Sequence, residues 1–480
     1  MKREHPLLPR RRQALLPVAL ASLLLSGCAS LAPDAGFAPL QAQTRTLLGQ
    51  ELAWPRDAGQ QAEAERRVSA LLAQALTADA AVQIALLNHR GLRAALFELA
   101  VLDAERVQAS RLPNPGFSIG RLARGEEREI ERGLHFDLAR LLALPAAAEV
   151  AQRRLAQTRQ DLALQVLAVA AQARQRQIEA VAAEEQLRQA RRVMAAAEAG
   201  AELARRLAEV GNISRLQQAR EHGFYADAAL GVAQAQAAAA SAREALVRAL
   251  GLWGDQLAQL KLPERLPDLP AQPRELPEVE RQAIAQRLDV QSARQAAEVR
   301  AAELGLTKRT RFVNVLELGL QRNSSNEAPT QRGVELSLEL PIFDWGEARN
   351  ARAEALYMQA LERTAEVAIN ARSEAREAYQ RYRGAFEIAQ HHAREIVPLR
   401  QRIADENILR YNGMLIGTLE LLADARGQIA GVAAAIAAKR DFLLAEARLD
   451  QALLGPIGAA PAPASASPST AASAEAAGGH

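Results

Sequence analysis

A strict alternation of apolar and polar side chains runs from residue 334 to residue 340. Successive side chains of a strand point to opposite faces, so this alternation predicts a β-strand over 333–340 with one apolar and one polar face. The apolar face would hold Val334, Leu336, Leu338 and Leu340. The polar face would hold Glu335, Ser337 and Glu339.

Three further stretches have the pattern of strands, namely residues 116–122, 132–139 and 312–322. The first two flank a polar turn region at 125–128, and a second polar loop follows the third. Within 132–139, apolar and polar residues alternate again. The apolar ones are Leu134, Phe136 and Leu138, and the polar ones are His135 and Asp137. Four strands in two hairpins are therefore expected.

The rest of the chain has the pattern of long helices, which are predicted over 78–111, from 146 to about 210, and over 217–250. No Gly or Pro interrupts residues 146–199, and a helix of that length would extend roughly 80 Å at 1.5 Å per residue. Further helices are predicted over 278–306, 345–409 and 419–454, with a kink expected at Pro398. Alanine-rich faces permit close antiparallel packing, as in coiled coils. The expected fold is mostly α with a small β part.

The same order of elements occurs twice, which indicates two internal repeats. The first repeat would cover 28–262, with its long helical hairpin at 146–250, and the second would cover 278–454, with its hairpin at 345–454. A linker at 263–277 contains several prolines, which no helix can cross. The tail at 455–480 is rich in Ala, Ser and Pro and is predicted to be disordered.

A sheet of four strands leaves two edges whose backbone N–H and C=O groups would be unpaired in lipid. Further copies of the chain could supply the missing neighbours. Two copies would give eight strands and three copies twelve, and both numbers are found in membrane barrels. The alternative is a soluble sheet packed on the helices, which alternation alone does not exclude.

Composition and charge narrow the class of protein. Aromatic residues make up only 4% of the 480 residues, which favours helices packed through small side chains over a thick globular core. The total charge is +3, but five basic residues and one acidic residue before Cys28 contribute +4, which leaves −1 for the rest. The remainder is therefore not basic, and nucleic-acid binding is not expected.

The N-terminus resembles a bacterial lipoprotein signal peptide over residues 1–27. Basic residues up to Arg12 precede an apolar run, which ends in Leu-Ser-Gly before Cys28, the single cysteine of the chain. The run is shorter than the about 20 residues that a transmembrane helix needs. The resemblance implies covalent diacylglycerol and an N-acyl lipid on Cys28, and Ala29 after it implies sorting to the outer membrane. An ordinary signal peptide with an incidental cysteine is the alternative.

Candidate catalytic motifs are weak. Residues 116–120 match G-x-S-x-G, but Ser118 lies within a predicted strand, whereas a nucleophile elbow needs a sharp turn into a helix. His391 and His392 are neighbours on a predicted helix and would point to different sides, so they would not chelate one metal ion. No phosphate-binding loop or metal-ligand cluster is found in the sequence. We expect neither an enzyme nor a cofactor other than the lipid.

The ordered combination of these features resembles the TolC-type outer-membrane efflux proteins over roughly residues 60 to 455. The resemblance includes the strand-to-helix junction at 340–346 and the two chain reversals near residues 210 and 412. It implies a homotrimer in which each chain gives four strands to one twelve-stranded outer-membrane β-barrel. The long helices would continue it as an α-barrel across the periplasm. One departure is that residues 141–146 lack the Asp-x-Gly found at 344–346.

The resemblance also implies a function and sites. The chain would be a lipid-anchored, passive exit duct in the outer membrane of a Gram-negative bacterium, working with a periplasmic adaptor and an inner-membrane pump in efflux or secretion. The adaptor would contact the two helical tips, formed by Val210, Gly211, Asn212, Tyr411, Asn412 and Gly413. Acidic rings at the periplasmic gate would be formed by Glu420 and Asp424, which stand at i and i+4 of one helix face.

Two alternatives stay open at this stage. The chain could be a lipid-anchored periplasmic coiled-coil scaffold without a pore. Glu420 and Asp424 could equally belong to a solvated helix face rather than to a gate. The transported substrate is not indicated by any residue.

Overall fold

The computed structural model describes residues 30–312 and 315–458 and divides them into two compact units. The unit that we call the sheet unit contains the described residues of 1–38, 97–159 and 292–365. The helical unit contains the described residues of 39–96, 160–291 and 366–480. The predicted signal peptide, Cys28 and most of the predicted disordered tail lie outside the described residues.

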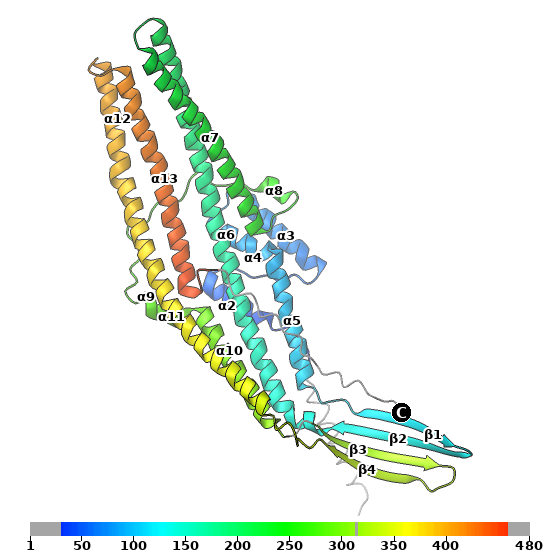
Figure 1. Cartoon of the computed structure of the whole chain (residues 1–480). Coiled ribbons are helices and arrows are strands. Elements are labelled where there is room, and N and C mark those ends of the chain that lie inside the picture. The colour runs from blue at the N-terminus through cyan, green and yellow to red at the C-terminus, as the bar shows by residue number, and fades with distance from the viewer. Residues whose placement is uncertain (1–29, 313–314, 459–480) are drawn as a thin grey trace, which may run out of the picture. The chain divides into compact units, whose positions relative to one another are not determined.

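The four expected strands form one antiparallel sheet in the order β1-β2-β3-β4 (Figure 1). The strands are β1 (Gly116–Arg124), β2 (Glu127–Asp137), β3 (Leu316–Ser325) and β4 (Gln331–Leu338). A tight turn at Gly125, whose φ of 61° suits glycine, joins the first pair. The sheet thus contains both predicted hairpins, and β1 and β4 are its edges.

Several predicted strand ends were wrong by a few residues. The strand predicted over 132–139 begins at Glu127 and ends at Asp137, because Asp137 caps the next helix by accepting a hydrogen bond from the Arg140 N–H at 2.8 Å. Leu138 therefore belongs to a helix. The strand predicted over 333–340 ends at Leu338, so Glu339 and Leu340 lie beyond it. Pro341, which has no N–H to donate, follows.

Four helices of more than 20 residues have one end in the sheet unit and the other end in the helical unit. They are α5 (Arg90–Ser110), α6 (Leu138–Glu209), α10 (Leu288–Arg309) and α11 (Glu347–His391). Helix α6 has 72 residues and contains Pro145, so the prediction that it begins at residue 146 was wrong. Helix α11 begins after Asp344 accepts a hydrogen bond from the Gly346 N–H at 2.8 Å. An aspartate thus stands at both strand-to-helix junctions.

Ion pairs link helices α6 and α10 within the sheet unit. Arg154 and Arg300 both contact the carboxylate of Glu303, the second at 2.7 Å. Burial alone would raise the pKa of Glu303, but the hydrogen bonds from the two arginines outweigh it and hold that pKa below its ordinary value. The carboxylate therefore stays ionised and links α6 to α10.

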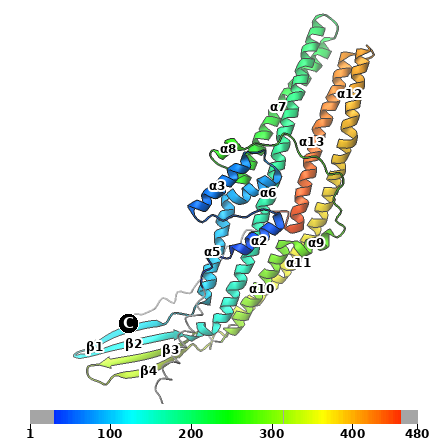
Figure 2. The ribbon, with the colours of Figure 1, turned by 180° about the vertical axis from the view of Figure 1, so that it is seen from behind.

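The helical unit also holds α2 (Phe37–Leu48), which begins just before it, α3 (Ala58–Leu72), α4 (Ala78–Asn88), α7 (Arg215–Leu250), α8 (Gln256–Gln259), α9 (Val279–Gln286), η2 (His392–Ile396), α12 (Val397–Asn412) and α13 (Thr418–Leu454). Helix α7 returns alongside α6, and α13 returns alongside α12 (Figures 1 and 2). These are the ends of the two predicted hairpins.

Two of the predicted helices, over 78–111 and 278–306, are each broken once by a residue with an extended backbone. The helix predicted over 78–111 divides at His89 into α4 and α5, and that predicted over 278–306 divides at Arg287 into α9 and α10. At the kink predicted for Pro398, the π-helical turn η2 ends directly before α12, whose second residue is Pro398. A wider turn relieves the clash and the lost hydrogen bond that proline causes.

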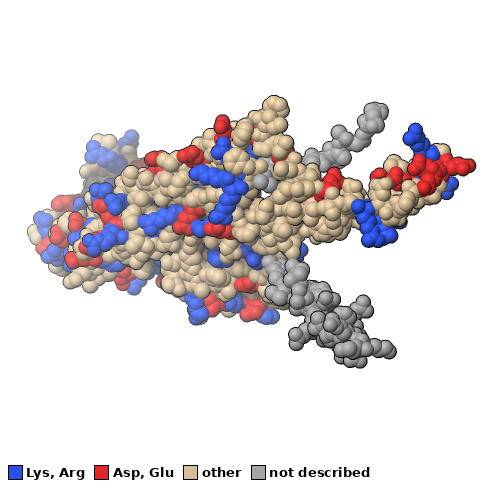
Figure 3. Space-filling model, turned by 90° about the horizontal axis from the view of Figure 1, so that it is seen from below, with Lys and Arg blue, Asp and Glu red and all other residues tan. Residues whose placement is uncertain are grey.

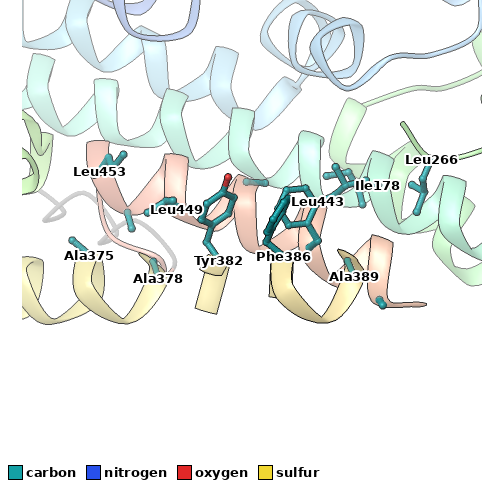
Figure 4. Close-up of a cluster of buried hydrophobic side chains, with 14 of the residues drawn as sticks. Ile178, Leu266, Ala375, Ala378, Tyr382, Phe386, Ala389, Leu443, Leu449 and Leu453 are labelled. Carbon is teal, nitrogen blue, oxygen red and sulfur yellow. The ribbon is translucent and has the colours of Figure 1, made fainter. Parts of the chain in front are cut away.

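The largest buried cluster of the helical unit joins α6, α11, α13 and the Pro-rich linker (Figure 4). Phe442 of α13 packs its ring 5.5 Å from that of Tyr382 and 5.6 Å from that of Phe386 on α11. The linker is attached to this cluster, because the Arg274 N–H donates to the Tyr382 hydroxyl at 2.9 Å and Leu266 is buried. None of the helices within the described residues is long and apolar enough to cross a membrane.

Candidate functional site

The register of the sheet sorts its side chains into two faces, because residues paired directly across antiparallel strands lie on the same face. On the face that we call the apolar face, three rows are entirely apolar. The rows are Phe117-Leu134-Leu320-Val334, Phe136-Leu318-Leu336 and Leu316-Leu338. Leu336, in the middle of β4, is 64% exposed. The predicted apolar face of this strand thus continues across the whole sheet.

The opposite face, which we call the polar face, collects the acidic side chains of the sheet. Glu335 and Ser337, both predicted for the polar side of their strand, are exposed here. The acidic residues of this face are Glu127, Glu129, Glu131, Asp137, Glu317 and Glu335. Arg124 lies on the same face, where it pairs with Glu127 across the turn. Figure 3 shows charged side chains of both signs gathered on the sheet, at the right of the view.

Ser118 lies in the middle of β1 and has no nucleophile-elbow geometry. Its hydroxyl oxygen lies 3.1 Å from Nε2 of His135 on the polar face. Gly133 leaves room for this contact, since a Cβ there would lie 2.8 Å from the same imidazole nitrogen. Within the described residues, no carboxylate forms a hydrogen bond with His135, so this pair lacks the third member that orients a catalytic histidine.

The connection between α6 and α7 reverses the chain at the residues predicted for the first helical tip. Helix α6 ends at Glu209, Gly211 takes a φ of 78°, and Val210 is exposed. Ser214 then caps α7 in a reciprocal pair with Gln217, so the returning helix begins at Arg215, two residues before the predicted start. Asn212 lies in this turn, where its N–H donates to the Leu207 carbonyl at 2.8 Å.

The second turn has a different geometry. Helix α12 ends at Asn412, and the left-handed residue of this turn is Met414, with a φ of 59°, whereas Gly413 has a φ of −81°. The Leu415 N–H reaches back to the Arg410 carbonyl at 2.8 Å, a bond typical of a helix end that has a left-handed residue. Met414 and Leu415 are both exposed. Tyr411 and the two residues after it lie at the end of α12, as expected.

The two proposed gate residues have different surroundings. Glu420 is exposed in the first turn of α13. Asp424, one turn later, is half-buried and accepts a hydrogen bond from the side chain of Asn407, a buried residue of α12. The hairpin thus holds the Asp424 carboxylate in place, whereas the Glu420 carboxylate points into solvent in the single chain.

One set of residues was missed by the sequence reasoning, namely the arginines of the apolar face. Arg132, Arg322 and Arg332 form the next row after the apolar rows. The local every-second-residue pattern places each of these residues on the same face as Leu134, Leu320 and Val334, but only the register between strands brings the three into one row. A search of the described residues for metal-binding clusters of His, Cys, Asp and Glu finds none.

Comparisons with known proteins bear on the fold. Neither the protein-family models nor the curated protein sequences give a match to this chain. Solved structures do match: CusC is 19% identical, covers 82% of this chain and 92% of its own length, and gives a TM-score of 0.64. The outer membrane protein VceC of Vibrio cholerae is 15% identical, with 84% and 100% coverage and a TM-score of 0.65.

The MtrE outer membrane channel of Neisseria gonorrhoeae is a further similar structure. It is 18% identical, with 82% and 89% coverage and a TM-score of 0.64. These likenesses extend over most of each chain, and they agree with the element order, the four-stranded sheet and the two long helical hairpins described above. The chain therefore has the fold of the TolC-type outer-membrane efflux proteins.

Proposed function

We propose that this chain is the outer-membrane channel of an efflux or secretion system. The observation that carries the proposal is the sheet itself: it has an exposed apolar face, an acidic face, and two edges, β1 and β4, without a neighbouring strand among the described residues. A sheet of this kind is suited to lipid only when its edges are closed into a barrel. Similar solved structures are named as outer-membrane channels, which supports the same reading.

In the proposed assembly, three copies supply twelve strands to one barrel. The apolar face contacts lipid, and the acidic polar face lines the water-filled interior. The helical hairpins extend into the periplasm, where their two turns contact an adaptor protein that connects the channel with an inner-membrane pump. The exposed apolar residues of the turns, Val210, Met414 and Leu415, suit such a contact. The duct is passive, and the pump selects the substrate.

The experiment is a single-channel recording of the purified full-length protein in a planar lipid bilayer. A barrel lined by the acidic polar face should give discrete conductance steps and a preference for cations, because fixed carboxylates attract them. Folded protein that gives no conductance steps, and no oligomer in detergent, would favour the pore-free scaffold instead.

The gate has its own test. Glu420→Gln combined with Asp424→Asn should lower cation selectivity and weaken block by trivalent cations, while oligomer yield stays unchanged. Asp424→Asn alone is measured beside the double variant. This substitution removes the charge that accepts the hydrogen bond from Asn407, so it gives the contribution of Asp424 separately from that of Glu420. Unchanged selectivity in the double variant would return both residues to a solvated surface.

Anchoring is proposed to occur through lipid on Cys28. Cys28→Ser should accumulate as an unprocessed precursor, because the modifying enzyme needs the thiol. Normal processing and acyl labelling of this variant would contradict the proposal. Several acyl chains would give firm attachment, since a single chain gives only marginal membrane binding.

A further inference from the structure

The two faces of the sheet differ sharply in charge as well as in polarity. The apolar face carries five arginines, which are Arg121, Arg128, Arg132, Arg322 and Arg332. Within the four strands, every aspartate and glutamate lies on the polar face. The arginines of the apolar face therefore have no acidic neighbour on their own side of the sheet.

Three of these arginines stand side by side. Arg132 of β2 pairs directly with Arg322 of β3, which pairs directly with Arg332 of β4, and Ile119 of β1 completes the row. Side chains paired in this way have their Cβ atoms about 4.5–5.5 Å apart, and like charges at that spacing repel each other. A row of three guanidinium groups is therefore unfavourable unless an anion lies between them.

The described part of the chain supplies no such anion. Arg132 donates only to the hydroxyl of Ser324, at 3.2 Å, and this partner is neutral. The guanidinium groups of Arg322 and Arg332 have no hydrogen-bond or ion-pair partner among the described residues, and both side chains are exposed. The row is thus a preformed set of donors with its charge uncompensated.

The place of the row indicates which anion it meets. It lies two residues along the strands, or about 7 Å, from the apolar row Phe117-Leu134-Leu320-Val334. It also lies on the side of the hairpin turns. At the opposite side, where the strands join the helices, the exposed apolar residues include three aromatic ones, Phe312, Phe343 and Trp345. Aromatic residues at one boundary, leucines between and arginines at the other match the layers of a membrane.

We propose that Arg132, Arg322 and Arg332 bind the phosphate groups of an anionic membrane lipid at the outer boundary of the apolar face. The proposal rests on the proposed function in one respect, since the apolar face must lie in lipid. Guanidinium groups bind phosphate oxygens in pairs of parallel hydrogen bonds, and the neighbouring apolar row accepts the acyl chains. A soluble anion would use the arginines but not the apolar row.

The test uses the full-length protein in a non-ionic detergent, with native mass spectrometry to count bound lipids. Phosphatidylglycerol and phosphatidylcholine are compared, because both carry a phosphate but only the first has a net negative charge. The wild type should bind phosphatidylglycerol in preference. The triple variant Arg132→Gln, Arg322→Gln and Arg332→Gln should lose roughly a hundredfold in affinity for it, taking about fivefold for each arginine.

A matched control separates this face from the other. Arg124→Gln removes a basic residue of the polar face at the turn of the same hairpin, and it should leave lipid binding unchanged. A second variant, Arg322→Glu, should remove lipid binding without destabilising the sheet. It places a carboxylate between Arg132 and Arg332, so the charges in the row attract each other. The preference for phosphatidylglycerol should nevertheless be abolished.

The possible outcomes are distinct. An unchanged lipid preference in the triple variant, or an equal loss in Arg124→Gln, would overturn the proposal. Competition by inorganic phosphate at concentrations equal to those of the lipid would also overturn it, because the site would then take a soluble anion. Conductance steps in a planar bilayer from both wild type and triple variant would show that the proposed channel function stands independently of the lipid result.

Discussion

The helical cluster and the sheet both present large apolar side chains, but only one of them covers these side chains within a single chain. Tyr382 and Phe442 in the cluster are 0% exposed, whereas Leu336 in the sheet is 64% exposed and Phe343 at its base is 99% exposed. Exposed apolar surface on this scale indicates an interaction with lipid or with another protein. The helical cluster is therefore complete in one chain, and the sheet is not.

The comparison predicts the largest loss of stability for a truncation inside the cluster. Phe442→Ala removes a ring packed between Tyr382 and Phe386, and it should lower the free energy of unfolding by about 3–5 kcal/mol. Phe343→Ala is the matched control, because its ring has no cover in the single chain. Denaturant titration of the detergent-solubilised protein measures both. Equal losses would mean that the two regions do not differ as described.

The next effect concerns the apolar face of the sheet. Leu336→Arg should lower the stability of the membrane-inserted protein by roughly 2–4 kcal/mol if the residue lies near the middle of the bilayer, because a charge would face lipid. Ser337→Arg, on the neighbouring position, should be milder because its side chain enters water. Assembly in lipid vesicles, followed by resistance to heat during electrophoresis, compares the two. Similar assembly of both variants would reject the assignment of the faces.

A smaller effect is expected where the linker joins the cluster. Tyr382→Phe keeps the ring but removes the hydroxyl that accepts the Arg274 N–H, which should cost about 1–3 kcal/mol because a partly buried donor is left without a partner. Tyr379→Phe removes the longer contact to the Leu276 N–H, at 3.3 Å, and should cost less. Thermal unfolding of the two variants gives the comparison, and a larger loss for Tyr379→Phe would contradict it.

The smallest expected effects concern the two connections between antiparallel helices, at residues 211 and 414. Met414 has a φ of 59°, a conformation that is unfavourable for side chains, so Met414→Gly should stabilise the protein by about 1 kcal/mol. Gly211 has a φ of 78°, and Gly211→Ala should destabilise it by a similar amount. Hydrogen exchange of the helix ends next to each turn measures both changes. A destabilising Met414→Gly would mean that the methionine side chain makes a contact that outweighs the strain.

The sequence predicted those features that depend on regular alternation or on the absence of helix breakers. The existence of the four strands and the faces of two of them, predicted over 132–139 and 333–340, follow from every-second-residue patterns, and the long helices follow from stretches without Gly or Pro. The strand ends did not follow, because Asp137 reads equally well as the last polar residue of a strand and as the cap of a helix. Capping became evident only from the hydrogen bond to the Arg140 N–H.

The remaining features were missed for two different reasons, one local and one not. The breaks at His89 and Arg287 occur at residues that helices tolerate, and the folded chain compensates for each one. At the second break, for example, Arg287 pairs with Asp289 and Glu374. The row of three arginines was missed because it forms only when strands far apart in the sequence are placed in register. Contacts between distant segments are beyond what a local pattern can specify.

The central claim, a closed ring of three chains joined through β1 and β4, has a direct measurement. Arg121→Cys on β1 and Val334→Cys on β4 place one thiol on each edge strand, both on the apolar face. A short bis-maleimide added to the double variant should link neighbouring copies, and electrophoresis should show a ladder that stops at three chains. Each single variant should give no ladder beyond a pair. No linked species, or a ladder that continues past three, would contradict the account, because the first excludes paired edges and the second indicates an open assembly.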